Sequence, residues 1–396
     1  MEEYKTYKLQ DVIQDIAAGP FGSNLPVSCF TSSGFPIIDG ANLKGFSVTD
    51  NITKFVSEGK ARSLHRSIAK RGDVIVTISG TIGQIAYIPE DSRYTEYLVS
   101  QRQFRVSFDQ TKIYIPFLVY YFHTAEGQHK ILSFANQTGV PALSQPLKNF
   151  KNIEVKIPSV EAQRKMMEPI LSLDSKIEIN RRINGNLEQQ AQALYAKAFS
   201  STNTCKMGDV VETTSGGTPS RKNQNYFSSQ GIKWIKSKEL NGSFIFDSEE
   251  HISNDGLCNS SAKLLPPNST LIAMYGATVG AYGLTIDNAT CNQAICALLP
   301  NSQYPYTYLY MWAKNNKDEL IQKAIGSAQQ NISQIIIKNM PVANEKDKII
   351  RFDSDTRYIF SLMKSLAKEN YNLIALRDAL LPRLMSGELK INDLNR

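Results

Sequence analysis

Apolar residues between about Pro158 and Phe199 recur at the spacing of one long helix. The repeat is seven residues long and has two seam positions in each repeat, like the a and d positions of a coiled coil. The apolar residues of this predicted seam are Ile170, Leu173, Ile177, Leu187 and Leu194. Because proline is favoured at the first position of a helix, Pro169 predicts a helix of roughly 30 residues, about 45 Å long. Such a seam requires a partner helix.

The C-terminal region carries the same seven-residue period. Its predicted seam consists of Ile359, Leu362, Leu366, Leu373, Leu376 and Leu380. Pro382 and the following Ser386-Gly387 predict a kink and then the end of this helix. Because enough chain for a globular domain lies between the two helices, we expect them to pack as an antiparallel coiled coil. The alternative, in which each helix only covers its own domain, leaves the seven-residue period unexplained.

Outside the helices, short strand-like runs are separated by glycine and proline turns. Residues 11–13 followed by Gly19 match residues 209–211 followed by Gly217, and later landmarks keep the same order. Within the first copy, the clearest helical spacing covers Pro116 to Leu132. The sequence therefore predicts an α+β chain with a pseudo-twofold internal repeat, in which two similar strand-rich α/β domains alternate with two long helices. The predicted boundaries are 1–158, 159–203, 204–342 and 343–396.

Composition adds little to this picture. With 42% hydrophobic and 20% charged residues, a chain of 396 residues can bury two or three ordinary cores. A net charge of +7 is compatible with a polyanionic partner without identifying one. The five cysteines form no CxxC pair, so neither a disulfide framework nor a metal site is indicated. The N-terminal segment lacks the layout of a signal peptide, and a cytoplasmic location is expected.

Catalytic signatures are missing from the sequence. It contains no GxxxxGK[ST] phosphate-binding loop, no GxGxxG, and no Asn/Asp-Pro-Pro-aromatic motif of the kind expected in a DNA adenine methyltransferase. Glu154-Val155-Lys156 resembles half of a nuclease metal site, but Asp109, the nearest upstream aspartate, is distant along the chain. A single-chain DNA endonuclease therefore stays as one alternative, and a coiled-coil scaffold as another.

Polar, basic and glycine-rich loops occur at matching places in both domains. Amide side chains can pair with adenine and arginine or lysine with guanine, whereas glycine permits close approach of the backbone. The candidate DNA contacts of the first domain are Gly22, Ser23, Asn24, Asn42, Lys44, Ser79, Thr81, Gln101, Arg102, Gln137 and Thr138. Those of the second are Ser215, Gly217, Thr218, Ser220, Arg221, Lys222, Lys236, Ser237, Lys238, Tyr275, Thr278, Asn292, Gln293, Gln329 and Gln330. For any one of them, a solvated loop side chain is the alternative.

Several stretches, taken in order, resemble a known family. They are Ser215 to Ser220 followed by Trp234 to Ser237, the turn from Gly276 to Gly280 followed by Asn292-Gln293, and the ending from Leu380 to Leu389. The whole chain resembles the DNA-specificity subunit of type I restriction-modification enzymes. The first domain departs from the family-like SGGTPS stretch, because it has Gly19-Pro20-Phe21-Gly22-Ser23 instead.

The resemblance implies a protein without catalytic activity of its own. Each domain is then expected to act as a target-recognition domain that reads one half of a split site in double-stranded DNA, with the two helices setting the gap between the halves. The helices are also expected to dock two modification (methyltransferase) subunits and, in the full complex, the restriction (translocase and nuclease) subunits. No cofactor is expected on this chain, since S-adenosylmethionine, ATP and Mg²⁺ would belong to the partners. No membrane association is expected.

Overall fold

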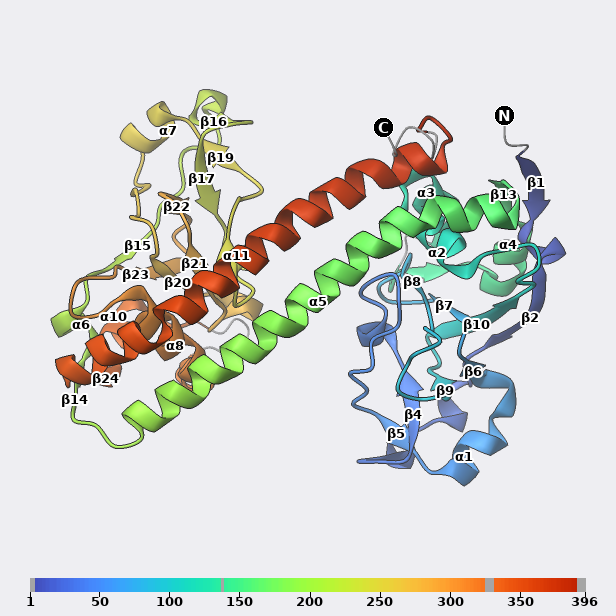
Figure 1. The fold of residues 1–396 in the computed structure, drawn as a ribbon, viewed down its shortest axis with the longest axis horizontal. Helices are drawn as coiled ribbons and strands as arrows, with labels where there is room; N and C mark the ends of the chain where they lie inside the picture. Colours follow the sequence, from blue (N-terminus) through green and yellow to red (C-terminus); the bar gives the residue numbers. More distant parts are fainter. Residues whose placement is uncertain (1–3, 137–138, 325–330, 390–396) are drawn as a thin grey trace. The chain divides into compact units, whose positions relative to one another are not determined.

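The computed structural model describes residues 4–136, 139–324 and 331–389 (Figure 1). Contacts divide the chain into two compact units. Unit 1 consists of Met1–Asp174 and Ala375–Arg396, and unit 2 consists of Ser175–Ile374. Each unit combines a strand-rich body with part of two long helices, α5 (Val160–Phe199) and α11 (Lys346–Met385).

The remaining elements are short. The strands of unit 1 are β1 (Lys5–Lys8), β2 (Ile13–Ala18), β3 (Phe30–Thr31), β4 (Phe35–Ile38), β5 (Phe55–Val56), β6 (Ile68–Lys70), β7 (Val74–Thr77), β8 (Ile85–Tyr87), β9 (Glu96–Val99), β10 (Gln103–Phe108), β11 (Ala135–Asn136), β12 (Ala142–Leu143) and β13 (Glu154–Ile157). Its short α-helices are α1 (Glu58–Ser63), α2 (Ile115–His123), α3 (Ala125–Leu132) and α4 (Pro146–Asn152).

Unit 2 has a similar set of elements. Its strands are β14 (Thr204–Lys206), β15 (Thr213–Ser215), β16 (Phe227–Ser228), β17 (Ile232–Ile235), β18 (Phe244–Ile245), β19 (His251–Ile252), β20 (Thr270–Ala273), β21 (Tyr282–Thr285), β22 (Thr290–Cys291), β23 (Ile295–Leu298) and β24 (Pro341–Ala343). Its short α-helices are α6 (Met207–Val210), α7 (Asn254–Cys258), α8 (Tyr306–Asn315), α9 (Lys317–Gln322) and α10 (Gln334–Asn339).

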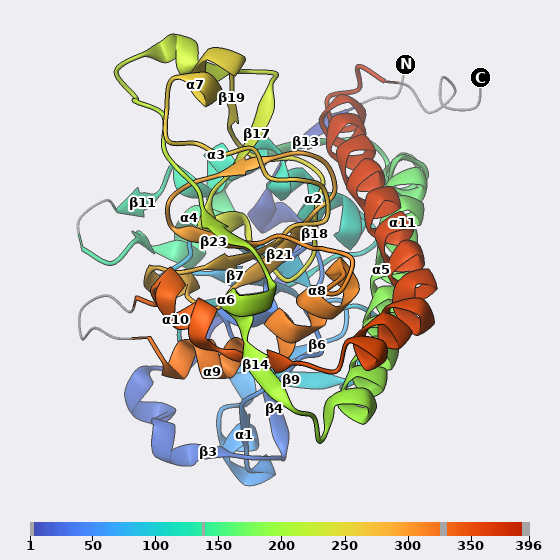
Figure 2. The same ribbon diagram turned by 90° about the vertical axis from the view of Figure 1, so that its left-hand side faces the viewer.

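Both units use one sheet plan. The order β2-β10-β7-β8 in unit 1 corresponds to β15-β23-β20-β21 in unit 2, where β18 extends the sheet. A second sheet contains one parallel pair in each unit, β4 with β9 and β17 with β22. The central strands β7 and β20 are buried at all four positions, as expected for apolar and β-branched runs covered on both faces. In unit 2, α8 packs against β20 and β21 (Figure 2). The predicted α+β class and internal repeat are confirmed.

The long helix α5 is longer than the sequence predicted, because Pro169 lies inside it and not at its start. A proline in a helix interior removes one backbone hydrogen bond and usually kinks or breaks the helix. Here the neighbouring Met166, Met167 and Ile170 are almost completely buried in the core of unit 1. We attribute the continuity of α5 to this packing, which offsets the lost hydrogen bond. Pro382 likewise lies inside α11, which ends only at Met385.

The single helix predicted from Pro116 to Leu132 is two helices, α2 and α3. Thr124 lies between them in an extended conformation and caps α3 by accepting a hydrogen bond from Gly127 N at 3.2 Å. A side chain at Gly127 would stand 2.2 Å from the carbonyl oxygen of Tyr121. The glycine therefore lets α3 turn back closely on α2, a tertiary constraint that helical spacing cannot reveal.

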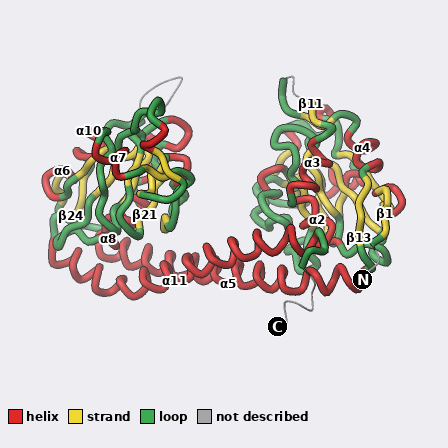
Figure 3. Tube along the Cα trace, turned by 90° about the horizontal axis from the view of Figure 1, so that it is seen from above, coloured by secondary structure: helices red, strands yellow, loops and turns green. Residues whose placement is uncertain are grey.

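Within each unit, α5 and α11 lie side by side (Figure 3). In unit 2, Asn180 donates to Asn370 Oδ1 at 3.0 Å, and Asn184 donates to the carbonyl oxygen of Met363 at 3.2 Å. Going along α5 from Asn180 to Asn184, the contacted residue on α11 changes from Asn370 to Met363, which is earlier in the sequence. The two helices are therefore antiparallel. In unit 1, Arg377 of α11 forms an ion pair with Asp174 of α5 at 2.7 Å.

The structure agrees better with the predicted seam of α5 than with that of α11. Ile170 and Ile177 are buried, and Leu173, Leu187 and Leu194 are half-buried. On α11 five predicted positions are only half-buried, namely Ile359, Leu362, Leu366, Leu373 and Leu380. Leu376 is 48% exposed, so its assignment to a buried seam is corrected.

The most buried positions of α11 follow the predicted ones by about one residue. They include Phe360 and Met363 in the core of unit 2 and Leu381 and Leu384 in the core of unit 1. A heptad rule assumes that a helix is buried by one partner helix. Because α11 packs against α5 and also against the strand-rich bodies, its buried face is rotated from the one predicted.

Candidate nucleic-acid interface

In unit 2, backbone hydrogen bonds bring three of the predicted DNA-binding segments together. Gly217 N donates to the carbonyl oxygen of Cys291 at 3.0 Å, which joins the loop 215–222 to the segment 291–293. Asn292 N donates to the carbonyl oxygen of Ile235 at 3.0 Å, directly before Lys236. Thr218 also donates a side-chain hydrogen bond to Gln293. Residues far apart in the sequence thus form one polar surface.

The turn that carries Tyr275 and Thr278 joins the same surface. Met274 N donates to the carbonyl oxygen of Ala294 at 2.7 Å, and Thr278 donates to the carbonyl oxygen of Tyr275 at 3.0 Å. Gly276 and Gly280 have positive φ angles of 69° and 78°, which explains why glycines border this turn. The Tyr275 side chain is exposed. An exposed aromatic ring beside amide and hydroxyl groups is suited to contact with nucleic acid.

Unit 1 assembles the corresponding segments in the same way. Ser100 N donates to the carbonyl oxygen of Ile38 at 2.9 Å, as Asn292 does to Ile235. Ile78 N donates to the carbonyl oxygen of Arg102 at 2.7 Å, which holds the turn containing Ser79 and Thr81 next to Gln101 and Arg102. The exposed members of the predicted set in unit 1 are Gly22, Ser23, Asn24, Lys44, Thr81, Gln101 and Arg102, and Ser79 is half-buried.

One glycine at the base of the first loop is required in each unit. A Cβ atom at Gly19 would lie 1.9 Å from the carbonyl oxygen of Ser100, and one at Gly216 would lie 1.9 Å from that of Cys291. The strand registers, in which Phe104 pairs with Ala18 and Cys296 pairs with Ser215, make these two glycines equivalent. The counterpart of Gly19 is therefore Gly216, and the sequence match to Gly217 was wrong by one residue.

Asn42 is a predicted DNA contact that the structure assigns to the interior. Its side chain is buried, accepts a hydrogen bond from Asp39 N at 3.1 Å and donates one to the carbonyl oxygen of Asn51 at 3.2 Å. Because both ends of the amide are occupied within the protein, we correct its role to stabilising the turn after β4.

The remaining predicted residues of unit 2 differ in exposure. Thr218, Ser220, Arg221, Lys222, Lys238 and Gln293 are exposed, Ser215, Lys236, Ser237, Thr278 and Asn292 are half-buried, and Gly217 is buried. The predicted contacts Gln137, Thr138, Gln329 and Gln330 lie outside the described residues.

Two glutamates outside the predicted set of DNA contacts hold the basic side chains of unit 2. Glu250 forms ion pairs with Arg221 at 2.5 Å and with Lys236 at 2.6 Å, and Glu249 pairs with Lys238 at 2.6 Å. The hydrogen bonds from Arg221 and then Lys236 lower the pKa of Glu250 to about 2. The Arg221 guanidinium also lies over the Phe227 ring, 4.3 Å from its centroid. The sequence offers a signal for these two ion-pair partners, because the acidic pair Glu249-Glu250 follows the basic residues Lys236 and Lys238 along the chain.

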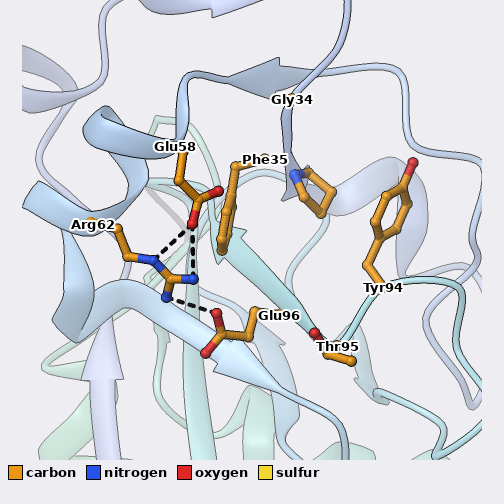
Figure 4. Close-up of a pocket in the computed structure, with 8 residues that line it drawn as sticks. Gly34, Phe35, Glu58, Arg62, Tyr94, Thr95 and Glu96 are labelled. Atoms are coloured by element: carbon orange, nitrogen blue, oxygen red, sulfur yellow. Dashed lines mark hydrogen bonds and ion pairs between the residues drawn. The ribbon is translucent and has the colours of Figure 1, made fainter.

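None of the predicted DNA contacts lines the cavity of about 240 Å³ in unit 1 (Figure 4). Arg62 lines it and forms ion pairs with Glu58 at 2.9 Å and Glu96 at 2.7 Å. The Phe35 ring centroid is 5.3 Å from the Arg62 guanidinium. The Arg62 cation is thus paired with two carboxylates at this cavity.

Potential metal ligands do not cluster in the described part of the chain. Among the residues that the structure describes, no group of three or more His, Cys, Asp or Glu side chains could hold a metal ion. Glu154 and Lys156 of the nuclease-like motif are exposed on β13, which pairs with β1. Over the same described ranges, no helix is long and apolar enough to cross a membrane.

Known proteins similar to this chain come from one family. A family model described as the type I restriction modification DNA specificity domain matches residues 1–189 and 200–350. The chain is similar to the specificity subunit of type I restriction enzyme HindI from Haemophilus influenzae, with 23% identity over 98% of this chain and 100% of that protein. It is also similar to the EcoR124I/EcoR124II specificity subunit from Escherichia coli, with 25% identity over 39% of this chain and 41% of that one.

A solved structure supports the fold. The crystal structure of a type I restriction-modification system S subunit from M. genitalium aligns with a TM-score of 0.57 and 12% identity. The alignment covers 97% of this chain and 96% of that chain. At this identity the similarity concerns the fold alone.

Proposed function

Because the chain belongs to the family of DNA-specificity subunits of type I restriction-modification systems, which are not themselves catalytic, we propose that it reads a split DNA site with one unit for each half. The observation that carries this proposal is the repetition of one polar surface with different side chains in the two units. In both, a loop, a glycine turn and an amide-bearing segment are joined by equivalent backbone hydrogen bonds. A shared frame with divergent loops is suited to reading two different sequences.

The residues proposed to contact DNA are the exposed and half-buried members of the two predicted sets. In unit 2 the basic members Arg221, Lys222, Lys236 and Lys238 supply phosphate or guanine contacts, and Asn292 and Gln293 supply amides for base edges. Unit 1 offers Arg102 and Lys44 with Gln101 and Asn24. Residues 1–158 and 204–342 form the two recognition domains in this proposal, and residues 159–203 and 343–396 form the helical spacer.

Partner subunits supply the chemistry in this proposal. The chain binds double-stranded DNA and docks two modification subunits, which bind S-adenosylmethionine, and restriction subunits, which require ATP and Mg²⁺. A cytoplasmic location follows from access to chromosomal DNA. The proposal that a single chain cleaves DNA is not favoured, because the chain belongs to a family of specificity subunits that are not themselves catalytic.

A map of N6-methyladenine in the host genome, with and without this gene, tests the proposed function. We expect the gene to be required for methylation of one motif made of two short defined halves around a fixed gap. A host that carries the partner subunits but shows an unchanged map on deletion would contradict the proposal. A continuous motif would contradict the division of labour between the units.

A further inference from the structure

Each unit has an ion pair at the same place in its fold, but the acidic and the basic residue are exchanged between the two units. Ile37 N donates to the carbonyl oxygen of Lys54 at 3.0 Å, and Trp234 N donates to that of Glu250 at 2.9 Å. These equivalent bonds make Lys54 and Glu250 counterparts. The next residues after β4 and β17 are Asp39 and Lys236, and they are counterparts for the same reason.

Each counterpart pair is joined by a salt bridge, but the charges are exchanged. In unit 1, Asp39 accepts from Lys54 at 2.5 Å, whereas in unit 2, Lys236 donates to Glu250 at 2.6 Å. A partly exposed ion pair contributes little to stability, and either polarity serves that purpose equally. The exchange therefore leaves the stability of the fold almost unchanged, and what it alters is the charge that each surface presents.

Both positions lie within the candidate DNA-binding surface. The residue before Asp39 accepts the backbone hydrogen bond from Ser100, and the residue before Lys236 accepts the one from Asn292. Each position therefore adjoins the amide-bearing segment of its unit. Asp39 is 22% exposed and Lys236 is 19% exposed at the side chain, so each is held in place by its partner yet accessible on one side.

The two side chains have complementary hydrogen-bonding chemistry. A carboxylate accepts hydrogen bonds and is suited to the exocyclic amino groups of cytosine and adenine, whereas an ammonium donates and is suited to O6 and N7 of guanine. Asp39 already accepts from Ala41 N and Lys54, but two carboxylate oxygens offer about four acceptor sites in all. Lys236 has three donors, and its contacts with Glu249 and Glu250 leave one for a base.

We propose that positions 39 and 236 are equivalent base-reading positions, at which Asp39 accepts from an amino group of cytosine or adenine and Lys236 donates to the acceptor edge of guanine. Lys54 and Glu250 are positioning residues that orient these side chains. The inference rests on the proposed function and adds to it the hydrogen-bond character of one base in each half of the site.

The test uses the full chain assembled with its modification subunits. The wild-type complex and the variants Lys236→Gln and Asp39→Asn methylate duplexes in which one base pair of the wild-type motif is changed at a time. Since glutamine pairs with adenine, Lys236→Gln is expected to shift preference from guanine toward adenine by roughly 10- to 100-fold at one position of one half. Asp39→Asn is expected to change one position of the other half.

Lys233→Gln is the matched control, because Lys233 lies at the other end of β17 and forms its own ion pair with Asp287 at 3.0 Å. It is expected to leave the motif unchanged. An unchanged base preference in both test variants would overturn the inference. An equal loss of methylation on every duplex would also overturn it, because a sequence-independent loss is the behaviour of a phosphate contact. Should one variant unfold in a thermal melt, the other still decides. A wild-type complex without a split motif would instead refute the proposed function.

Discussion

The loop after β2 in unit 1 exposes Phe21 and the uncharged residues Gly22, Ser23 and Asn24, whereas the equivalent loop in unit 2 carries Arg221 and Lys222. At the base of each loop a glycine, Gly19 or Gly216, nevertheless approaches a backbone carbonyl oxygen equally closely. The structure thus separates a backbone frame, which both units need in order to fold, from side chains that the frame presents. Variation in the second group costs little stability, so recognition can diverge while the fold is kept.

The strongest way to break the frame common to both units is to place a charge on a buried position of α5. Ile170 in unit 1 and Ile177 in unit 2 are one heptad apart and almost completely buried. We expect Ile170→Asp and Ile177→Asp each to lower the free energy of unfolding by about 4 kcal/mol, because an apolar contact is replaced by an unpaired buried carboxylate. Urea unfolding followed by circular dichroism measures this.

Leu376→Asp is the control for that experiment, since Leu376 was predicted to lie in the seam but is exposed. Its expected cost is about 0.5 kcal/mol or less. Equal losses at Leu376 and Ile177 would show that the buried face of the helices is not the one described here.

A second comparison concerns the glycines that close the two recognition loops. Gly19→Ala and Gly216→Ala are each expected to cost about 2 to 3 kcal/mol, because the added Cβ would meet a backbone carbonyl oxygen at 1.9 Å. Gly59→Ala in unit 1 and Gly185→Ala in unit 2 are matched controls in helices with open space, and should stabilise by about 0.5 to 1 kcal/mol. Thermal unfolding of the four variants is the measurement. A harmless Gly216→Ala would contradict the assigned correspondence, whereas damage from Gly217→Ala is expected in either case, because its Cβ would lie 2.3 Å from the Ser261 carbonyl oxygen.

The smallest expected change in stability concerns the ion pairs of Glu250 in unit 2. The pKa of Glu250 in the folded protein, about 2, is below the value of 4.5 for an unperturbed glutamate. Its ionised form therefore stabilises the fold above about pH 4.5, and this contribution is lost as the pH falls toward 2. After solvent screening we expect about 1 kcal/mol. Between pH 6 and pH 3, Glu250→Gln should lose less stability than the wild type; identical pH profiles would contradict the assigned pairing.

Helical period and repeated landmarks were sufficient to predict the fold class, the repeat and both long helices. They failed where tertiary contacts decide the outcome. Pro169 continues a helix because buried neighbours compensate for it, and the buried face of α11 is rotated because strand-rich bodies pack on it. Neither effect can be derived from a local pattern.

The candidate site was predictable at the level of segments rather than of side chains. Polar loops at matching places were recognisable, but the burial of Asn42 and the pairing of Lys236 with Glu250 depend on residues distant in the sequence. The exchange of charge between positions 39 and 236 could be seen only after the strand registers had aligned the two units.

The central claim is that each unit reads its own half of a split site, and exchange of one recognition domain tests it most directly. Residues 204–342 would be replaced by the corresponding domain of another family member, and the methylated motif of the hybrid complex would be mapped. We expect the half read by unit 1 to stay unchanged while the other half takes the sequence of the donor. A hybrid that is active but altered in both halves would contradict the claim.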